Sequence, residues 1–200
     1  MPRSPTRPLI ALALAALMAG LPVASPAADG SAGAYLAARV AASENDFREA
    51  ALWYDRLIDT GHADPALLEG AIIAHLSLGE VDQAADLSRR LIQVGGRSQS
   101  AYIALLADQA ARGDFTGLIA DTKAGRSIGR LLDALVMAWA ALGEGRMSDA
   151  VADFDTLAKS PGLEAFGLYH KALALASAGD FEGADNILSG REAGQIALMR

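Results

Sequence analysis

Apolar segments of helical length alternate with short turns from residue 32 to about residue 190. The same turn signal recurs five times, as Gly or Asn followed by a polar residue and then an apolar one. The first residues of these turns are Asn45, Gly79, Gly113, Gly145 and Gly179. They are 34, 34, 32 and 34 positions apart, and a fixed period in this range is typical of stacked repeats. We therefore predict five helix-turn-helix units.

Each turn has a physical explanation. Gly adopts a left-handed backbone without penalty, and Asn tolerates it better than most residues. An acid in the next position favours the start of a helix, and Asp46 with Glu49, like Glu80 with Gln83, has the spacing of a capping box. In four of the units an Ala follows five residues after the turn, where a small side chain lets the two helices approach. These are Ala50, Ala84, Ala150 and Ala184.

The third unit departs from this pattern. It has Leu118 where the other units have Ala, and Gly117, Gly125 and Gly129 fall in or just after its second helix. Because Gly destabilises a helix, this second helix is expected to be weak.

The repeat pattern resembles the tetratricopeptide repeat (TPR) family, whose 34-residue helical hairpins stack into a right-handed superhelix. Tyr54 and Phe154 match the aromatic of the family's second helix, and Pro65 and Pro161 fall near joints between units. The resemblance, which extends to exported bacterial TPR-like proteins, implies an all-α fold, a right-handed α-solenoid of about five TPR-like units over residues 32–190. Residues 191–200 are then an incomplete or capping helix, or the start of a longer repeat array.

The first 30 residues have the organisation of a leader. Residues 1–8 contain Arg3 and Arg7 and no acid, residues 9–21 are apolar and uncharged, and small residues and Pro follow. This order is typical of a secretory signal peptide, and the apolar run is shorter than the roughly 20 residues of a membrane-spanning helix. We predict a signal peptide over residues 1–27, cleaved after Ala27 or Ala28, and a short linker over 28–31.

The leader predicts a periplasmic protein, with no membrane span in the mature chain. A retained leader would instead anchor the chain in the inner membrane. The sequence contains no Cys, so a lipid anchor on Cys, a disulfide and a thiolate metal site are all excluded.

Net charge and the absence of known motifs narrow the range of possible functions. The net charge is −7, and removing the two leader arginines leaves 15 basic against 24 acidic residues, or −9, so nucleic acid is not an expected partner. His62, His75 and His170 lack the four-residue spacing of a helical metal site. No nucleophile elbow or phosphate loop is present, so we expect no catalytic residue, no metal and no cofactor. Lys171 should face a neighbouring helix with its ammonium in water.

The resemblance also implies a binding face. In the TPR family the first helices line a concave surface that receives a segment of a partner. Helical periodicity places the positions 13, 10, 6 and 3 residues before each turn on one face. The candidate partner-binding residues chosen from these positions are Ile73, Leu76, Ile103, Leu135, Trp139, Leu142, Phe166, Tyr169 and Leu173.

The members of this set in the fourth and fifth units form an aromatic and aliphatic patch. Such a patch is a groove for an apolar segment, a buried core, or a contact between subunits. The sequence therefore predicts a scaffold or adaptor in the bacterial cell envelope that binds a protein or peptide. An accessory subunit of an envelope assembly or polysaccharide-export machine is one alternative, and a cell-wall binding module or enzyme is another. Self-association through the C-terminal end is a further alternative.

Overall fold

The computed structural model describes residues 30–189. The predicted signal peptide and the predicted terminal segment 191–200 lie outside these residues. Within residues 30–189 the chain forms ten helices and no strand, which confirms the predicted all-α fold. The helices are α2 (Gly30–Ser43), α3 (Phe47–Asp59), α4 (Pro65–Leu78), α5 (Val81–Gln93), α6 (Gln99–Ala111), α7 (Phe115–Lys123), α8 (Arg130–Gly143), α9 (Met147–Ala158), α10 (Glu164–Ser177) and α11 (Phe181–Ser189).

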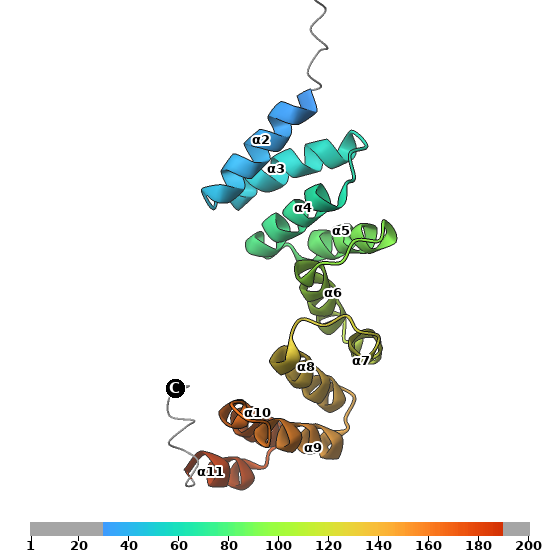
Figure 1. The fold of residues 1–200 in the computed structure, drawn as a ribbon. Coiled ribbons are helices and arrows are strands. Elements are labelled where there is room, and N and C mark those ends of the chain that lie inside the picture. Colours follow the sequence, from blue (N-terminus) through green and yellow to red (C-terminus); the bar gives the residue numbers. More distant parts are fainter. Residues whose placement is uncertain (1–29, 190–200) are drawn as a thin grey trace, which may run out of the picture.

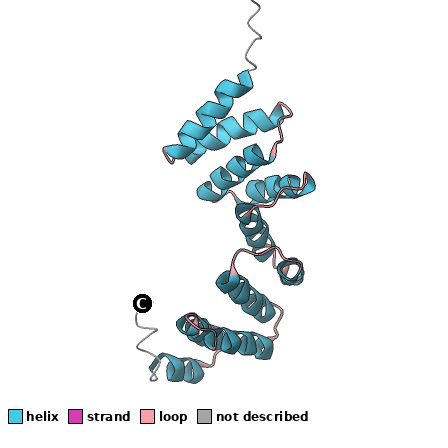
Figure 2. Cartoon of the chain, viewed as in Figure 1, coloured by secondary structure: helices cyan, strands magenta, loops and turns pink. Residues whose placement is uncertain are grey.

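The helices form five consecutive hairpins that stack into a curved solenoid (Figure 1). Each second helix also packs against the first helix of the next unit. The packing of α7 against α6 and α8 is less extensive than that of the other second helices. The chain runs in an arc from α2 at one end to α11 at the other, with all connections in short loops (Figure 2). The first helices of the upper units lie toward the hollow side of the arc, and α3, α5 and α7 lie toward its outer side.

The turns have the geometry that their residues favour. The backbone angle φ is positive at all five turn positions, from 61° at Asn45 to 89° at Gly179. Asp46 caps α3 by accepting a hydrogen bond from the backbone N of Glu49 at 3.1 Å, and this anchors the start of the helix. Glu80 makes no such cap bond, so the second of the two proposed capping boxes does not form.

The core is divided along the stack. One buried cluster extends from α2 to α6 and includes Tyr54, Leu68 and Ile72. Another surrounds Phe154 between α8 and α10. Between them lies a small cluster centred on Leu118 of α7. Because α7 has only nine residues, the third unit is the thinnest part of the solenoid, as its glycines indicate.

Candidate functional site

A row of exposed apolar side chains follows the first helices. Each of α2, α4, α6, α8 and α10 contributes one large apolar residue that is 38–45% exposed, at a position predicted for the concave face. We call this set the apolar row, and its members are Tyr35, Ile73, Ile103, Leu132 and Leu173. Large apolar side chains that stay exposed on successive helices are candidates for binding another molecule.

The nine predicted residues occupy three environments. Ile73, Ile103 and Leu173 are exposed members of the apolar row, and Leu135 is only 9% exposed, inside the core around Phe154. The remaining residues are half-buried: Leu76, Trp139, Leu142, Phe166 and Tyr169. The predicted patch of the fourth and fifth units is therefore part core and part surface. Leu135 supports the patch from beneath.

An apolar pocket opens beside this patch, where α6, α7 and α8 meet. Its volume is about 370 Å³, and almost all of its lining is apolar. We call it the joint pocket; its walls are Leu106, Ala110, Phe115, Leu118, Val136, Trp139, Ala140, Leu142 and Gly143. Trp139 and Leu142 were predicted as binding residues, whereas Phe115, Leu106 and Val136 were not.

Local packing explains the joint pocket. The Phe115 ring lies directly against Gly143, where an added Cβ would be 2.6 Å from the ring. The Phe115 ring therefore occupies the space next to Gly143 of α8. Because α7 is short, a space between α6 and α8 stays open and forms the pocket. Leu106 stands where three other units have Ala38, Ala138 and Ala172. This bulky residue, together with Leu118 and the glycines of the third unit, was the sequence signal for an unusual joint.

Trp139 is held rigidly at the edge of the pocket. Its Nε1 donates a hydrogen bond to Nδ1 of His170 at 3.1 Å. Its ring meets the Phe154 ring edge-on, with centroids 5.7 Å apart. Burial lowers the pKa of His170 and so favours the neutral imidazole that this hydrogen bond requires. One side of the indole is therefore fixed by α9 and α10, and it also lines the joint pocket.

Comparison with solved structures identifies the fold. The chain aligns with the crystal structure of YrrB, a TPR protein with an unusual peptide-binding site, with a TM-score of 0.59 and 14% identity over 76% of this chain and 79% of YrrB. It also aligns with MamA protein, with a TM-score of 0.62 and 13% identity over 83% of this chain and 95% of that one. The fold is TPR-like. A second structure, MamA MSR-1 C2, gives a TM-score of 0.55 and 16% identity over 78% of this chain and 95% of its own length.

Sequence comparison does not extend this similarity. No protein-family model matches the chain, and no curated protein matches it either. The repeat signals at the turns are visible in the sequence, and the TPR-like fold is visible in the structure. The sequence identities to the solved structures are so low that the comparison shows a shared fold and nothing more.

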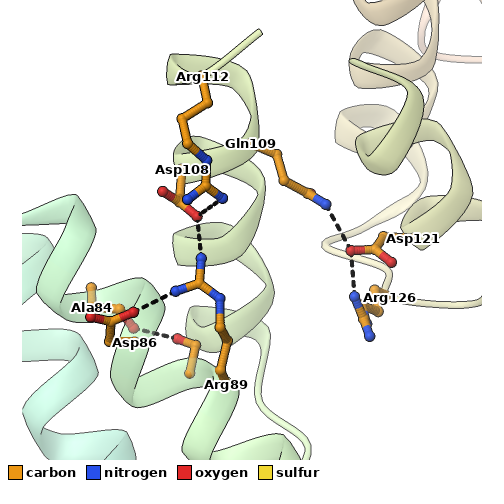
Figure 3. Close-up of polar contacts among 9 residues, drawn as sticks. Ala84, Asp86, Arg89, Asp108, Gln109, Arg112, Asp121 and Arg126 are labelled. Atoms are coloured by element: carbon orange, nitrogen blue, oxygen red, sulfur yellow. Dashed lines mark hydrogen bonds and ion pairs between the residues drawn. The ribbon is translucent and has the colours of Figure 1, made fainter. Parts of the chain in front are cut away.

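The TPR-like stack also contains a polar cluster, which joins α5 to α6. The carboxylate of Asp108 is buried and accepts a hydrogen bond from Arg89 of α5 at 2.5 Å, and it also pairs with Arg112 (Figure 3). Arg89 pairs with Asp86 as well, at 2.5 Å. Two guanidinium groups therefore neutralise one buried carboxylate.

A second part of the cluster joins α6 to α7. Asp121 accepts a hydrogen bond from Gln109 at 2.9 Å and pairs with Arg126 in the following loop (Figure 3). The cavity of about 360 Å³ beside these groups is lined by arginines and aspartates that already bind one another. Its charges are matched internally, so we interpret this cluster as a structural connection across the weak third unit.

Two further ion pairs connect neighbouring units. His75 is buried, with Nδ1 2.7 Å from Glu80 and Nε2 3.1 Å from Asp55 of the preceding unit. Lys171 Nζ is 2.7 Å from Asp155, also in the preceding unit. Lys171 does face a neighbouring helix as predicted, but its ammonium binds a carboxylate instead of extending into water. Asp55 and Asp155 both stand ten positions after their turns, a signal that the sequence contained.

The pairing of His75 makes stability depend on pH. The hydrogen bond to Asp55 raises the pKa of His75 most, and the hydrogen bond to Glu80 also raises it, against the opposing effect of burial. Because the folded-state pKa is above the unfolded value, this contribution is fully present below about pH 6.5 and is lost as the pH rises through the folded pKa. We expect His75→Gln to lower the melting temperature more at pH 5 than at pH 8.

Thermal melts of both variants at the two pH values measure this effect. His62→Gln is the matched control, because the His62 side chain is exposed and hydrogen-bonds Thr60, not a carboxylate. His170, whose pKa is shifted in the opposite direction, is present in every variant and cancels in the comparison. An equal loss at both pH values would show that His75 stays neutral.

Across residues 30–189 no helix is at once long and apolar enough to cross a bilayer. In the same part of the chain, no three His, Asp or Glu side chains converge as metal ligands.

Proposed function

We propose that this chain is a protein-interaction scaffold that holds a segment of a partner protein on its concave face. The observation that carries the proposal is the apolar row, to which all five first helices contribute. Apolar side chains exposed on one face of a protein can mark an interaction site. YrrB, which has the same fold, is a TPR protein with a peptide-binding site, and this supports the proposal.

The pocket and the row suggest what the partner segment contains. The joint pocket of about 370 Å³ is large enough for a bulky apolar side chain, and Trp139 stands at its edge. Fixed aromatic residues are frequent among the side chains that dominate binding energy. We propose a segment with one large apolar anchor for this pocket and smaller apolar residues along the row.

The compartment proposed for this binding is the bacterial periplasm. The proposal rests on the leader over residues 1–27, which lies outside the described residues, and on the absence of Cys for lipidation. An envelope adaptor is consistent with an acidic surface that does not attract nucleic acid.

Trp139→Ala is expected to weaken partner binding by about thirtyfold, the effect of losing a hot-spot residue worth about 2 kcal/mol. Residues 28–200 and the variant are used as baits in an envelope extract, and peptides from each retained protein are then titrated. In a Trp53→Phe background Trp139 is the sole tryptophan, so its fluorescence reports binding at the pocket.

The matched control is Trp53→Ala, which removes the other indole from α3, away from the groove. Helicity of all baits is compared by circular dichroism. Equal affinity of the Trp139 and Trp53 variants for the same peptide would refute the pocket. If Trp139→Ala alone lost its helical signal, the indole would be a core residue and the groove proposal would fail.

A further inference from the structure

The hydrogen bond between Trp139 and His170 has a fixed direction. The indole N–H of Trp139 can only donate, so Nδ1 of His170, which lies 3.1 Å away, accepts and carries no proton. The proton of the neutral imidazole is then on Nε2. Within residues 30–189 neither side chain makes another hydrogen bond. The position of the indole at the edge of the joint pocket therefore depends on the protonation state of one nitrogen.

Aromatic rings on three helices hold the imidazole in place. The His170 ring stacks on Phe154 of α9, with centroids 6.3 Å apart and planes 17° apart. It meets the Trp139 ring of α8 edge-on at 6.1 Å and the Tyr169 ring of α10 edge-on at 5.6 Å. Because this stacking fixes the plane of the imidazole, Nδ1 stays directed at the indole N–H.

The imidazole has no counter-charge among the described residues. The charged side chains of the surrounding helices bind other groups or are in contact with water, and they are Arg130 and Asp133 of α8, Asp149, Asp153 and Asp155 of α9, Glu164 and Lys171 of α10, and Glu182 and Asp185 of α11. Burial lowers the pKa of His170 below its ordinary value of 6.5, and within residues 30–189 no carboxylate opposes this effect. The imidazole is therefore neutral at pH 7 and gains a proton only in acid.

We propose that His170 is the positioning residue of the joint pocket and that its protonation frees the Trp139 indole, so that the pocket binds in neutral solution and releases its ligand in acid. In the protonated imidazole Nδ1 carries a hydrogen, and two N–H donors then face each other. The indole is no longer fixed beside the pocket that it lines. This inference rests on the proposed function, in which the joint pocket receives an apolar side chain of the partner.

The indole N–H reports this contact without any ligand. In the Trp53→Phe background Trp139 gives the one indole N–H signal in the NMR spectrum. We expect this signal to shift in a single transition between pH 8 and pH 4.5, with its midpoint below pH 6.5. The transition should be absent from His170→Phe, which keeps a ring against Phe154 but offers no acceptor to the indole.

Binding is measured with N-phenyl-1-naphthylamine, a neutral apolar dye that fluoresces in apolar pockets. We expect residues 28–200, the predicted mature chain, to bind the dye about fivefold more tightly at pH 7.5 than at pH 4.5, the effect of one net hydrogen bond. His170→Phe should bind about fivefold more weakly than the unchanged chain at pH 7.5. His170→Asn is the matched rescue, because its Oδ1 stands as far along the side chain as Nδ1 and accepts without titrating. It should bind tightly at both pH values.

Two controls account for the other histidines. His62→Gln should bind the dye like the unchanged chain, because His62 is exposed in the loop between α3 and α4. His75 also titrates, and it is retained in His170→Phe, so any pH dependence left in that variant comes from the other groups. Circular dichroism compares the helicity of all variants at both pH values. If acid unfolds the chain, the comparison at pH 7.5 decides, and equal affinities of His170→Phe and His170→Asn would overturn the positioning role.

Trp139→Ala separates this inference from the proposed function. If the dye bound Trp139→Ala as tightly as the unchanged chain, the pocket would not depend on the indole, and both proposals would fall. Dye binding that depends on Trp139 but is equal at both pH values in a folded chain would overturn this inference alone. An indole signal that does not shift down to pH 4.5 would overturn it as well.

Discussion

Phe154→Ala should lower the free energy of unfolding by about 4 kcal/mol, the middle of the range for removing a buried Phe. Phe154 is fully buried at the centre of the C-terminal core. Its ring contacts Trp139 edge-on and stacks on His170, so three helices lose packing at once. A cavity at this point cannot collapse easily, because α8, α9 and α10 hold it from three sides.

The division of the core predicts where the loss appears. Trp53 lies beside the N-terminal core and Trp139 beside the C-terminal core. In urea titrations, single-tryptophan backgrounds made with Trp53→Phe or Trp139→Phe report the two halves separately. We expect Phe154→Ala to move the Trp139 transition to lower urea and to leave the Trp53 transition nearly in place, since repeat stacks can unfold in parts.

Phe154→Leu is the matched control, and an apolar replacement that keeps most of the volume should cost less than about 1.5 kcal/mol. If Phe154→Ala moved both transitions equally, the solenoid would be one cooperative unit in spite of the small cluster around Leu118.

The turns and the hairpins were predictable from sequence because they depend on local chemistry. Left-handed positions such as Gly113 and Asn45 are selected by the backbone alone. The side of a helix on which a residue lies also follows from the local periodicity. Ile73, Ile103 and Leu173 were chosen in this way, and the structure places them in exposed positions.

Depth within a face was not predictable. Leu132 and Leu135 are three residues apart on α8, yet Leu132 belongs to the apolar row and Leu135 to the core. Helical periodicity places both on one side of the helix, and only packing against the neighbouring helices decides which of them is buried. The joint pocket is similar: it results from the short α7 and the position of the Phe115 ring, and both are set by packing between units.

The ion pairs between units are an intermediate case. Asp55 and Asp155 stand at equivalent positions, and each binds a basic side chain on the next first helix. Aligning the repeats shows the acids, but the partners His75 and Lys171 differ in register, at four and eight residues before their turns. A pairing rule could therefore have been proposed from sequence, although not the individual contacts.

Asp108→Ala should lower the free energy of unfolding by about 2 kcal/mol, less than the 3–5 kcal/mol of a fully buried pair because Arg89 and Arg112 are partly exposed and can be hydrated. The carboxylate of Asp108 is almost fully buried between them. Its loss leaves two guanidinium groups near one another without a shared counter-ion, at the contact between α5 and α6 (Figure 3).

Asp86→Ala is the matched control, because Asp86 also pairs with Arg89 but is 79% exposed, and an exposed pair contributes about 0.2–1 kcal/mol. Urea titration followed by the Trp53 signal measures both variants, and a cycle with Arg112→Ala isolates the coupling with Asp108. Equal small losses for Asp86 and Asp108 would mean that the second unit and α6 are held by apolar packing alone. A larger loss for Asp108 means that the polar cluster replaces apolar packing next to the short α7, so that the stack stays continuous where its hydrophobic core is thinnest.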